Sequence, residues 1–415
     1  MNDRKAGPRI KSKKGSSAVF LTVIMAAIMS IALALIYGVK EETVRSSVDA
    51  VINLAGDSVM SEFDRNLHNE YGLFLIKGTD EELSRKLDMY VRYSIDEMKD
   101  VTIDAADVSA GRYSIINTSN IKEQIIEYMK AQAAEGIVDN ITGEDEKNAE
   151  TDAADRMEER TLRYGPAISS LPSATVPKKS LTAMAESLAD KADDVKAAFV
   201  SGTETYMISS YILGHFNSSV HIADNRHFFE NEVEYILGGE LSDKKNEKRV
   251  EMALKAMRFP INMAYLYADP ERQAALAAAA QIMTPGPAAA ATQAALTSTW
   301  AYAEADNDVE LLKKGIKVPM LKDSSTWAID LDSAIEGVFG GTVLPTKEKG
   351  YDYGQYLQIL LFFQDENIKI ARIMDLIQIN MRKSYDKDFL INEYATGISV
   401  RVKVNGKMYS YEKQY

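Results

Sequence analysis

Residues 18–39, AVFLTVIMAAIMSIALALIYGV, decide how this chain is organised. The stretch holds 22 residues with no charge and no proline, and about 20 apolar residues form a helix that crosses roughly 30 Å of hydrocarbon. A cleaved signal peptide has a shorter apolar region, of about 7 to 15 residues, before a small-residue cleavage site. This run continues to Tyr37-Gly38-Val39 before Lys40, so the pattern predicts a single transmembrane helix that remains as an anchor.

The two flanks of this segment differ in charge. Six basic residues precede it against Asp3 alone, and Glu41 and Glu42 follow it. Cytoplasmic flanks carry the excess of lysine and arginine, so we expect residues 1–17 to be a cytoplasmic tail and residues 40–415 to face outward from the cell membrane. The lipid bilayer is the first expected partner. The six basic residues are Arg4, Lys5, Arg9, Lys11, Lys13 and Lys14.

The outward part is strongly acidic. The whole chain has a formal net charge of -13, and the first fourteen residues contribute +5, which leaves -18 for the rest. Nucleic acid is excluded as a partner of this part, because phosphate binding needs a basic face. The chain has no cysteine, so a hydrophobic core rather than disulfides must hold it together.

Residue types that often carry chemistry do not form a recognisable site. Three histidines fall between residues 215 and 227 at spacings of six and six, whereas zinc ligands commonly lie closer together on a regular element. The acidic clusters 144–146 and 306–308 lack the spacing of a calcium-binding loop, and Gly-Asp-Ser at 56–58, which resembles the nucleophile block of a class of lipases, sits in a helical pattern. Phosphate-cradling glycine motifs are absent. We therefore expect that the protein is not an enzyme and that it has no metal, no cofactor and no small-molecule substrate.

A stripe of small residues runs along the apolar segment at every fourth position. Small residues let two helix backbones approach closely in lipid, where packing drives association. Chance is the alternative, because small residues are common in such helices. The stripe predicts packing against other membrane helices, and its members are Ala18, Thr22, Ala26, Ser30, Ala34 and Gly38.

The helical rhythm continues beyond the apolar segment. Apolar residues from Val44 to Phe63 keep a three-to-four-residue spacing, and no proline occurs between residues 8 and 166. The pattern predicts a continuous helix from about Ser17 to His68, roughly 75 Å long. Two pieces with a bend near Gly38 or Gly56 are the alternative.

Residues 13–20, KKGSSAVF, and the helix behind them resemble the N-terminus of type IV pilin-like proteins, and most of all the pseudopilins of the Tad (tight adherence) pilus systems. The resemblance implies cleavage between Gly15 and Ser16 and a long helix that first serves as a membrane anchor. It departs from the major pilins at the fifth residue of the mature chain, which is Glu in those proteins and Phe20 here.

The chain as a whole is similar to an uncharacterised family of single-span proteins from Clostridia-like bacteria that are associated with Tad-type pilus genes. The resemblance implies no catalytic residues. It rests on the anchor and on three further stretches, which are residues 70–74 (EYGLF), residues 232–237 (EVEYIL) and residues 356–378.

The pattern as a whole predicts a helix-rich α+β fold. After the basic tail at 1–17 and the transmembrane helix at 18–39, a membrane-proximal helix and a small mixed unit are expected at 40–137. Residues 138–180, acidic and then proline-containing, predict a linker or loop, and residues 181–415 predict a helix-rich outer domain that ends in a β-hairpin.

Within these regions, the apolar patterns and breaks predict individual elements. Strands are expected at 71–76, 232–237 and, as a pair turning at Gly111-Arg112, within 101–116. Helices are expected at 79–100, 120–136, 181–200, 204–216, 242–281 with interruptions at Pro260 and Pro270, and 353–384, and the Pro285-Gly286-Pro287 break predicts an antiparallel pair of helices.

The C-terminal hairpin is the clearest local pattern. Ile398, Val400, Val402 and Val404 alternate with polar residues, and Asn405-Gly406 is a preferred two-residue turn because both positions tolerate positive φ. This turn places Val402 opposite Tyr409 and Val400 opposite Tyr411. A third strand is needed for stability, and residues 232–237 or 71–76 are the candidates.

We therefore expect a membrane-anchored, non-catalytic, pseudopilin-like or accessory component of a Tad-type pilus or secretion assembly. A single-pass sensor or ligand-binding ectodomain at the bacterial cell surface is the alternative. A cytoplasmic tail of about fourteen residues has no room for a signalling domain, which favours the first interpretation.

Overall fold

The computed structural model describes residues 14–96, 98, 101–134, 170–337 and 342–415. The chain divides into two compact units. Unit 1 takes residues 1–62, 79–109 and 398–413, and unit 2 takes residues 63–78, 110–397 and 414–415. The main segment of unit 2 is therefore inserted between two strands of unit 1. The predicted helix-rich α+β class is confirmed.

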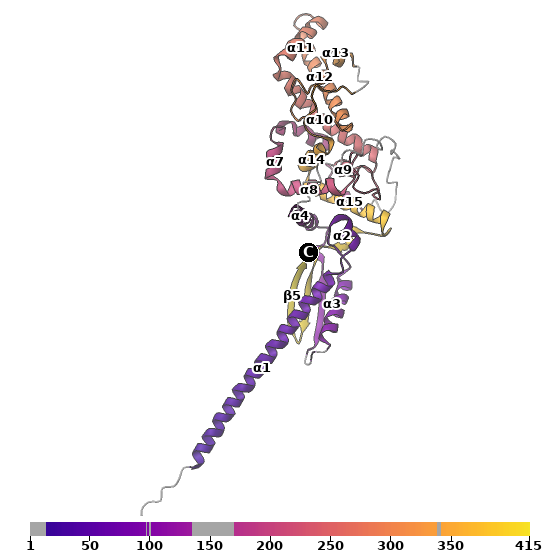
Figure 1. Ribbon diagram of the computed structural model, residues 1–415. Helices are drawn as coiled ribbons and strands as arrows, with labels where there is room; N and C mark the ends of the chain where they lie inside the picture. Colours follow the sequence, from indigo (N-terminus) through magenta and orange to yellow (C-terminus); the bar gives the residue numbers. More distant parts are fainter. Residues whose placement is uncertain (1–13, 97, 99–100, 135–169, 338–341) are drawn as a thin grey trace, which may run out of the picture. The chain divides into compact units, whose positions relative to one another are not determined.

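The first element is one unbroken helix, α1 (Lys14–Met60), of 47 residues (Figure 1). It runs through Gly38 and Gly56, so the continuous form predicted for this region is confirmed. The expected end at His68 is wrong, because the chain turns after Met60 and a separate helix, α2 (Arg65–Tyr71), begins. The Asp64 carboxylate caps α2 by accepting hydrogen bonds from the backbone N–H groups of its first turn at 2.9 and 3.2 Å.

In unit 1, the second half of α1 packs with helix α3 (Asp80–Ile95) and a three-stranded antiparallel sheet. The sheet has the order β2-β4-β5, formed by β2 (Ile103–Ser109), β4 (Gly397–Val404) and β5 (Lys407–Gln414). The α3 N-terminus carries the capping box that its acidic first turn predicts, with Thr79 and Glu82 exchanging hydrogen bonds. The buried core of the helix and the sheet includes Val48, Ile52, Ala55, Val59, Ile398, Val400, Val402 and Val404.

The predicted C-terminal hairpin is confirmed, with Asn405 at φ 51° and Gly406 at φ 76°. The Ser399 hydroxyl donates to Glu412 at 2.7 Å, which fits the register set by this turn. Its third strand is β2, not either of the predicted candidates. Residues 101–116 were predicted as two strands, but they form one strand and then a 3₁₀ turn at Gly111–Tyr113.

A row of polar contacts joins α1 to β5 along one edge of the sheet. On α1 the row uses residues four or eight positions apart, and on β5 it uses alternate residues, so about 24 Å of helix follows about 20 Å of strand. The pairs are Glu41 with Lys407 at 2.8 Å, Asp49 with Tyr411, Asn53 with Lys413 at 2.7 Å, and Asp57 with Lys413 at 2.6 Å.

Unit 2 is mainly helical, with a two-stranded sheet of β1 (Ile76–Lys77) and β3 (Tyr394–Ala395). The strand predicted at 71–76 is therefore reduced to its end. Besides α2, its described helices are α4 (Thr118–Ala134), α6 (Leu181–Ser187), α7 (Val195–Ser201), α8 (Thr203–His215), α9 (Glu232–Gly238), α10 (Asp243–Ala268), α11 (Pro270–Met283), α12 (Ala289–Lys313), α13 (Leu331–Glu336), α14 (Tyr353–Phe363) and α15 (Glu366–Ser384).

Three helix predictions need correction. The helix expected at 181–200 is broken into α6, a 3₁₀ turn and α7, and the helix expected at 353–384 is divided at Gln364-Asp365 into α14 and α15. In contrast, α10 continues through Pro260, where a break was predicted. The predicted linker at 138–180 lies outside the described residues as far as 169, and a 3₁₀ turn follows at Pro172–Thr175.

Residues 232–237 form the helix α9, so the predicted strand is wrong. Every residue of α9 is buried, and a helix buried on all sides shows no polar face from which its period could be read. Two signals do mark it as a helix: acidic residues in its first turn, and Gly239 at φ 70° directly after its end.

Helices α11 and α12 form the predicted antiparallel pair on either side of the Pro-Gly-Pro break. Thr292 hydrogen-bonds Thr284 near the turn, and Arg272 lies over the ring of Trp300 farther from it. The guanidinium carbon of Arg272 also lies 4.8 Å from the ring centre of Trp327 and 5.4 Å from that of Tyr265. One arginine is thus enclosed by three aromatic rings.

Candidate functional site

None of the described residues of unit 1 packs against the first half of α1. Its large apolar side chains are more than half exposed at almost every position, for example 65% at Leu21 and 63% at Ile36. Among the described residues it is the one helix long and apolar enough to cross a membrane. Exposed apolar surface of this extent marks a site of membrane or protein contact.

The predicted stripe lies in this exposed half. Thr22, Ala26, Ser30, Ala34 and Gly38 are all exposed. The Thr22 hydroxyl donates to the Val19 carbonyl and the Ser30 hydroxyl to the Ala26 carbonyl, both at 2.8 Å, so neither hydroxyl needs a partner outside the helix.

The stripe winds around the helix. An α-helix turns about 100° per residue, so each step of four residues moves the stripe by about 40°. Three successive members, Ala26, Ser30 and Ala34, stay within about 80° of one another. They are the part of the stripe that one partner helix can contact at a single crossing.

Gly15 and Ser16, the residues on either side of the predicted cleavage point, lie in the first turn of α1. Residues 1–13, which contain five of the six basic residues of the tail, lie outside the described residues.

The three histidines do not converge. His215 is largely buried and contacts the Tyr211 carbonyl and the Tyr128 hydroxyl, and burial lowers its pKa to about 4. His227 is 5% exposed, with Nδ1 2.7 Å from Glu232 Oε2. Of the three, only His221 is exposed.

An arginine bridges two carboxylates that lie near His227. Glu70 and Asp224 lie close to His227, but Arg226 stands between the two carboxylates. Its Nη2 atom is 2.8 Å from both oxygens of Glu70 and 2.5 Å from Asp224. This single cation offsets one of the two negative charges and hydrogen-bonds both carboxylates.

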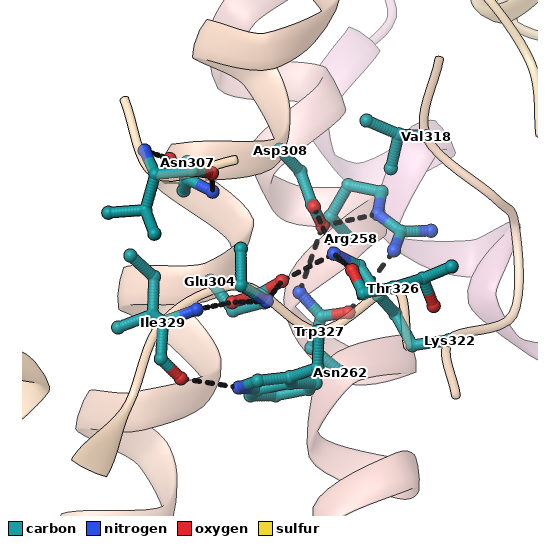
Figure 2. Close-up of polar contacts among 12 residues, drawn as sticks. Arg258, Asn262, Glu304, Asn307, Asp308, Val318, Lys322, Thr326, Trp327 and Ile329 are labelled. Carbon is teal, nitrogen blue, oxygen red and sulfur yellow. Dashed lines mark hydrogen bonds and ion pairs between the residues drawn. The ribbon is translucent and has the colours of Figure 1, made fainter. Parts of the chain in front are cut away.

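A buried ionic cluster, which was not among the predicted sites, joins α10, α12 and the segment after α12 (Figure 2). Arg258 Nε lies 2.9 Å from Asp308, and Lys322 Nζ lies 2.6 Å from the other oxygen of Asp308. Lys322 also binds Glu304 and donates to the Thr326 carbonyl at 2.9 Å. The four charged side chains are almost completely inaccessible to solvent.

The cluster is electrically neutral, since it contains two cations and two anions. Burial acts to raise the pKa of Asp308, but the charges of Arg258 and Lys322 outweigh it and hold that pKa below its ordinary value. Burial raises the pKa of Glu304 despite its contact with Lys322. Glu304 also accepts the backbone N–H groups of Ala328 and Ile329 at 3.0 and 2.8 Å. The arrangement fastens the segment after α12 onto the α10–α12 pair.

The helix α9 organises a third buried network, in the core of unit 2. Glu232 accepts from the Asn217 backbone N–H at 2.9 Å and from the Asn380 amide at 2.6 Å. Tyr235 donates to Asp375 at 2.8 Å. Arg372 donates to the last carbonyls of α9, at 2.6 and 2.7 Å, where the negative end of the helix dipole favours a cation.

Glu234, also on α9, is a buried carboxyl group in this network with one oxygen that accepts no hydrogen bond from the described residues. Its Oε1 atom accepts from Ser219 Oγ at 2.9 Å and from Tyr353 at 3.2 Å, whereas Oε2 is buried and has no hydrogen-bond partner among the described residues. Burial raises the pKa of Glu234 to about 7. A neutral carboxylic acid relieves this site, because its proton removes the cost of burying the charge.

The sequence did contain a signal for the ionic cluster. Arg258 and Asn262 are four residues apart on α10, and Glu304 and Asp308 are four residues apart on α12. On α12 the two carboxylates stand among buried alanines, at 301, 303 and 305. Charges on an apolar helix face at this spacing indicate buried partners.

The fold defines a helix-rich α+β protein with one long, exposed apolar helix at its N-terminal end. A family model, the Family of unknown function (DUF5702), matches residues 117–406. The chain belongs to this family. The match covers nearly all of unit 2 together with β4, and it leaves out α1, α3 and β2. Neither the curated proteins nor the solved structures contain a match to this chain.

Proposed function

We propose that this protein is a membrane-anchored, non-catalytic component of a bacterial surface assembly, pseudopilin-like or accessory to a Tad-type pilus or secretion machine. The observation that carries the proposal is α1. One continuous helix has a first half of exposed apolar residues, while its second half is built into the core of unit 1. In pilin-like proteins, a helix of this kind is first an anchor and then an assembly element.

The arrangement of charges supports a binding role over catalysis. In the part of the chain that the structure describes, the buried cluster of Arg258 and Asp308 and the network of α9 consist of groups that bind one another. General acid–base or nucleophilic chemistry needs such a group within reach of a substrate. The exposed apolar surface of α1 is instead a surface for lipid and for other membrane helices.

Residues 1–17 are proposed to lie in the cytoplasm, with residues 40–415 outside the cell. This orientation rests on the basic residues of the tail, since lysine and arginine near the ends of a span set its topology. The acidic residues of the outer part contribute little to it.

The intact mass of the mature protein from its native membrane tests the proposal. We expect loss of residues 1–15, leaving Ser16 as the N-terminus, and retention of the chain in the membrane pellet after alkaline carbonate washing. A full-length chain in the pellet would contradict pilin-type processing and favour a plain anchored sensor or ligand-binding ectodomain. Release by carbonate would contradict the anchor itself.

A further inference from the structure

The polar contacts between α1 and β5 fix which end of unit 1 lies nearest the apolar half of α1. Residue numbers rise together along the two elements, from Glu41 with Lys407 to Asp57 with Lys413. Strand β5 therefore runs in the same direction as α1, away from the apolar segment. Its first residue, and the Asn405-Gly406 turn before it, lie at the end of unit 1 closest to Val39.

The other strands and α3 place a second segment at the same end. Ile103 at the start of β2 pairs with Val404, directly before the turn. The Val108 N–H donates to Ser84 Oγ at 2.8 Å, so the start of α3 lies beside the end of β2. Helix α3 therefore runs opposite to β2, and its last turn, which holds Tyr93, lies near the Asn405-Gly406 turn.

Exposed aromatic and apolar side chains gather at this end. Tyr93 is 87% exposed, Met408 60% and Tyr37, at the end of the apolar segment, 68%. Lys403 and Lys407 flank the turn and are exposed. Tyrosine and lysine with long apolar stems are the residue types that favour the interface between lipid and water.

The distances match the depth of a headgroup layer. Glu41 lies two residues beyond Val39, about 3 Å along the helix axis. The polar headgroup region is about 5 to 8 Å thick on each side of the hydrocarbon. Because α1 is unbroken, no linker allows unit 1 to move away from the bilayer.

We propose that this end of unit 1, formed by the Asn405-Gly406 turn, Met408 and Tyr93, is a lipid-binding surface that sits in the headgroup layer of the bilayer crossed by α1. The inference rests on the proposed membrane anchor. It makes the C-terminal hairpin a second membrane contact of the protein, 366 residues after its partner Glu41 on α1.

Site-specific depth measurements test this surface, and the chain suits them because it has no cysteine of its own. The full-length variants M408C and Y93C would each carry an environment-sensitive fluorophore in vesicles of phosphatidylcholine and phosphatidylglycerol. A nitroxide on the lipid headgroup serves as the quencher. Both positions are exposed, so the label does not disturb the core.

Two further single-cysteine variants are controls. L54C places the label on the same helix at a residue that is 63% exposed, about 20 Å farther from the apolar segment than Glu41. I36C places it inside the predicted span, where a nitroxide on the lipid acyl chain is the matching quencher. We expect M408C and Y93C to lose most of their emission, L54C to keep it, and I36C to be quenched from the acyl chain.

The failures are distinguishable. Unquenched M408C and Y93C with quenched I36C would overturn the lipid-binding surface and leave the anchor intact. Blue-shifted but unquenched labels at 408 and 93 would show burial against a second copy of the chain, which also overturns it. An unquenched I36C would overturn the membrane anchor and with it the proposed function.

Discussion

Lys413 Nζ lies 2.6 Å from Asp57 Oδ1, so the last strand of the chain is fastened to its first helix across 356 residues of sequence. The close approach depends on the glycine beside Asp57. A Cβ atom at Gly56 would lie 3.3 Å from Lys413 Cε and 3.5 Å from Val400 Cγ2. The C-terminal hairpin is thereby connected to the apolar half of α1 through the second half of the same helix.

Replacing Gly56 with leucine should separate α1 from the sheet. The larger side chain must displace Val400 or the stem of Lys413, and overpacking of this kind costs about 1 to 3 kcal/mol. We expect faster amide hydrogen exchange in β4 and β5 of the full-length protein in detergent. Gly38→Leu is the control, because no atom of the described residues lies within 4 Å of a Cβ there. Unchanged exchange in G56L would contradict the packing of α1 on β4.

Asp308→Asn should destabilise unit 2 strongly. It leaves the buried charges of Arg258 and Lys322 without their shared anion, and breaking a buried pair from one side costs about 3 to 5 kcal/mol. Chemical denaturation of the full-length protein measures this. Asp306→Asn, two residues away, removes a partly exposed contact with Lys255 and should cost less than about 1 kcal/mol. Equal effects of the two variants would contradict the closed cluster.

Much of the local structure could be predicted from the sequence where the signal is local. Asn405-Gly406 fixes the turn through its positive φ angles, and Thr79 with its acidic followers fixes the start of α3. The continuity of α1 through Gly38 and Gly56 follows from the absence of proline and from its spacing of apolar residues, whereas its end at Met60 does not. These features need no knowledge of distant partners.

The third strand of the hairpin and the helix α9 could not be predicted in this way. The partner of β4 is set by a chain that returns after the whole main segment of unit 2, and loop closure of that length leaves no local pattern. For α9, burial on every side removes the periodicity. In the ionic cluster, the spacing on α10 and α12 marks Arg258, Glu304 and Asp308, but Lys322 reaches the two carboxylates from a segment without regular structure, which no local pattern predicts.

Glu234→Gln should change how stability depends on pH. A carboxyl group whose pKa rises from 4.5 to about 7 on folding binds its proton more tightly in the folded state. It therefore lowers the free energy of unfolding as pH rises from about 4.5 to about 7, by on the order of 3 kcal/mol. E234Q should be more stable than the natural protein at pH 8 and similar to it at pH 4.5, as measured by urea denaturation.

His215 acts in the opposite direction over part of this range. Burial lowers its pKa from 6.5 to about 4, so the unfolded state binds the proton more tightly and stability rises as pH increases between these values. The two groups oppose each other from about pH 4.5 to 6.5. In E234Q the free energy of unfolding should therefore rise with pH over that interval. If the difference in this free energy between the variant and the natural protein does not change with pH, the assignment to Glu234 is refuted.

Arg272→Lys should loosen the aromatic enclosure between α11, α12 and the segment before α13. The planar guanidinium lies over Trp327, Trp300 and Tyr265, and an ammonium group cannot stack in the same way. The expected loss of stability is about 1 to 2 kcal/mol. The chain has two tryptophans, both in this enclosure, so their emission reports on it directly. Arg45→Lys, at an exposed site, should leave the emission unchanged.

Leucine at Ser30 and Ala34 should weaken association between membrane helices. These two residues differ by about 40° around α1, so both lie on the face that a partner helix would approach, and larger side chains hold the backbones apart. A membrane two-hybrid assay and detergent-resistant association should both fall. The control is Ala32→Leu, which makes the same kind of change about 160° away from Ser30 on the helix. If S30L with A34L associates as well as the natural helix does, the stripe is not a contact surface. If A32L weakens association equally, the loss reflects bulk on any face, and lipid contact alone then accounts for the small residues.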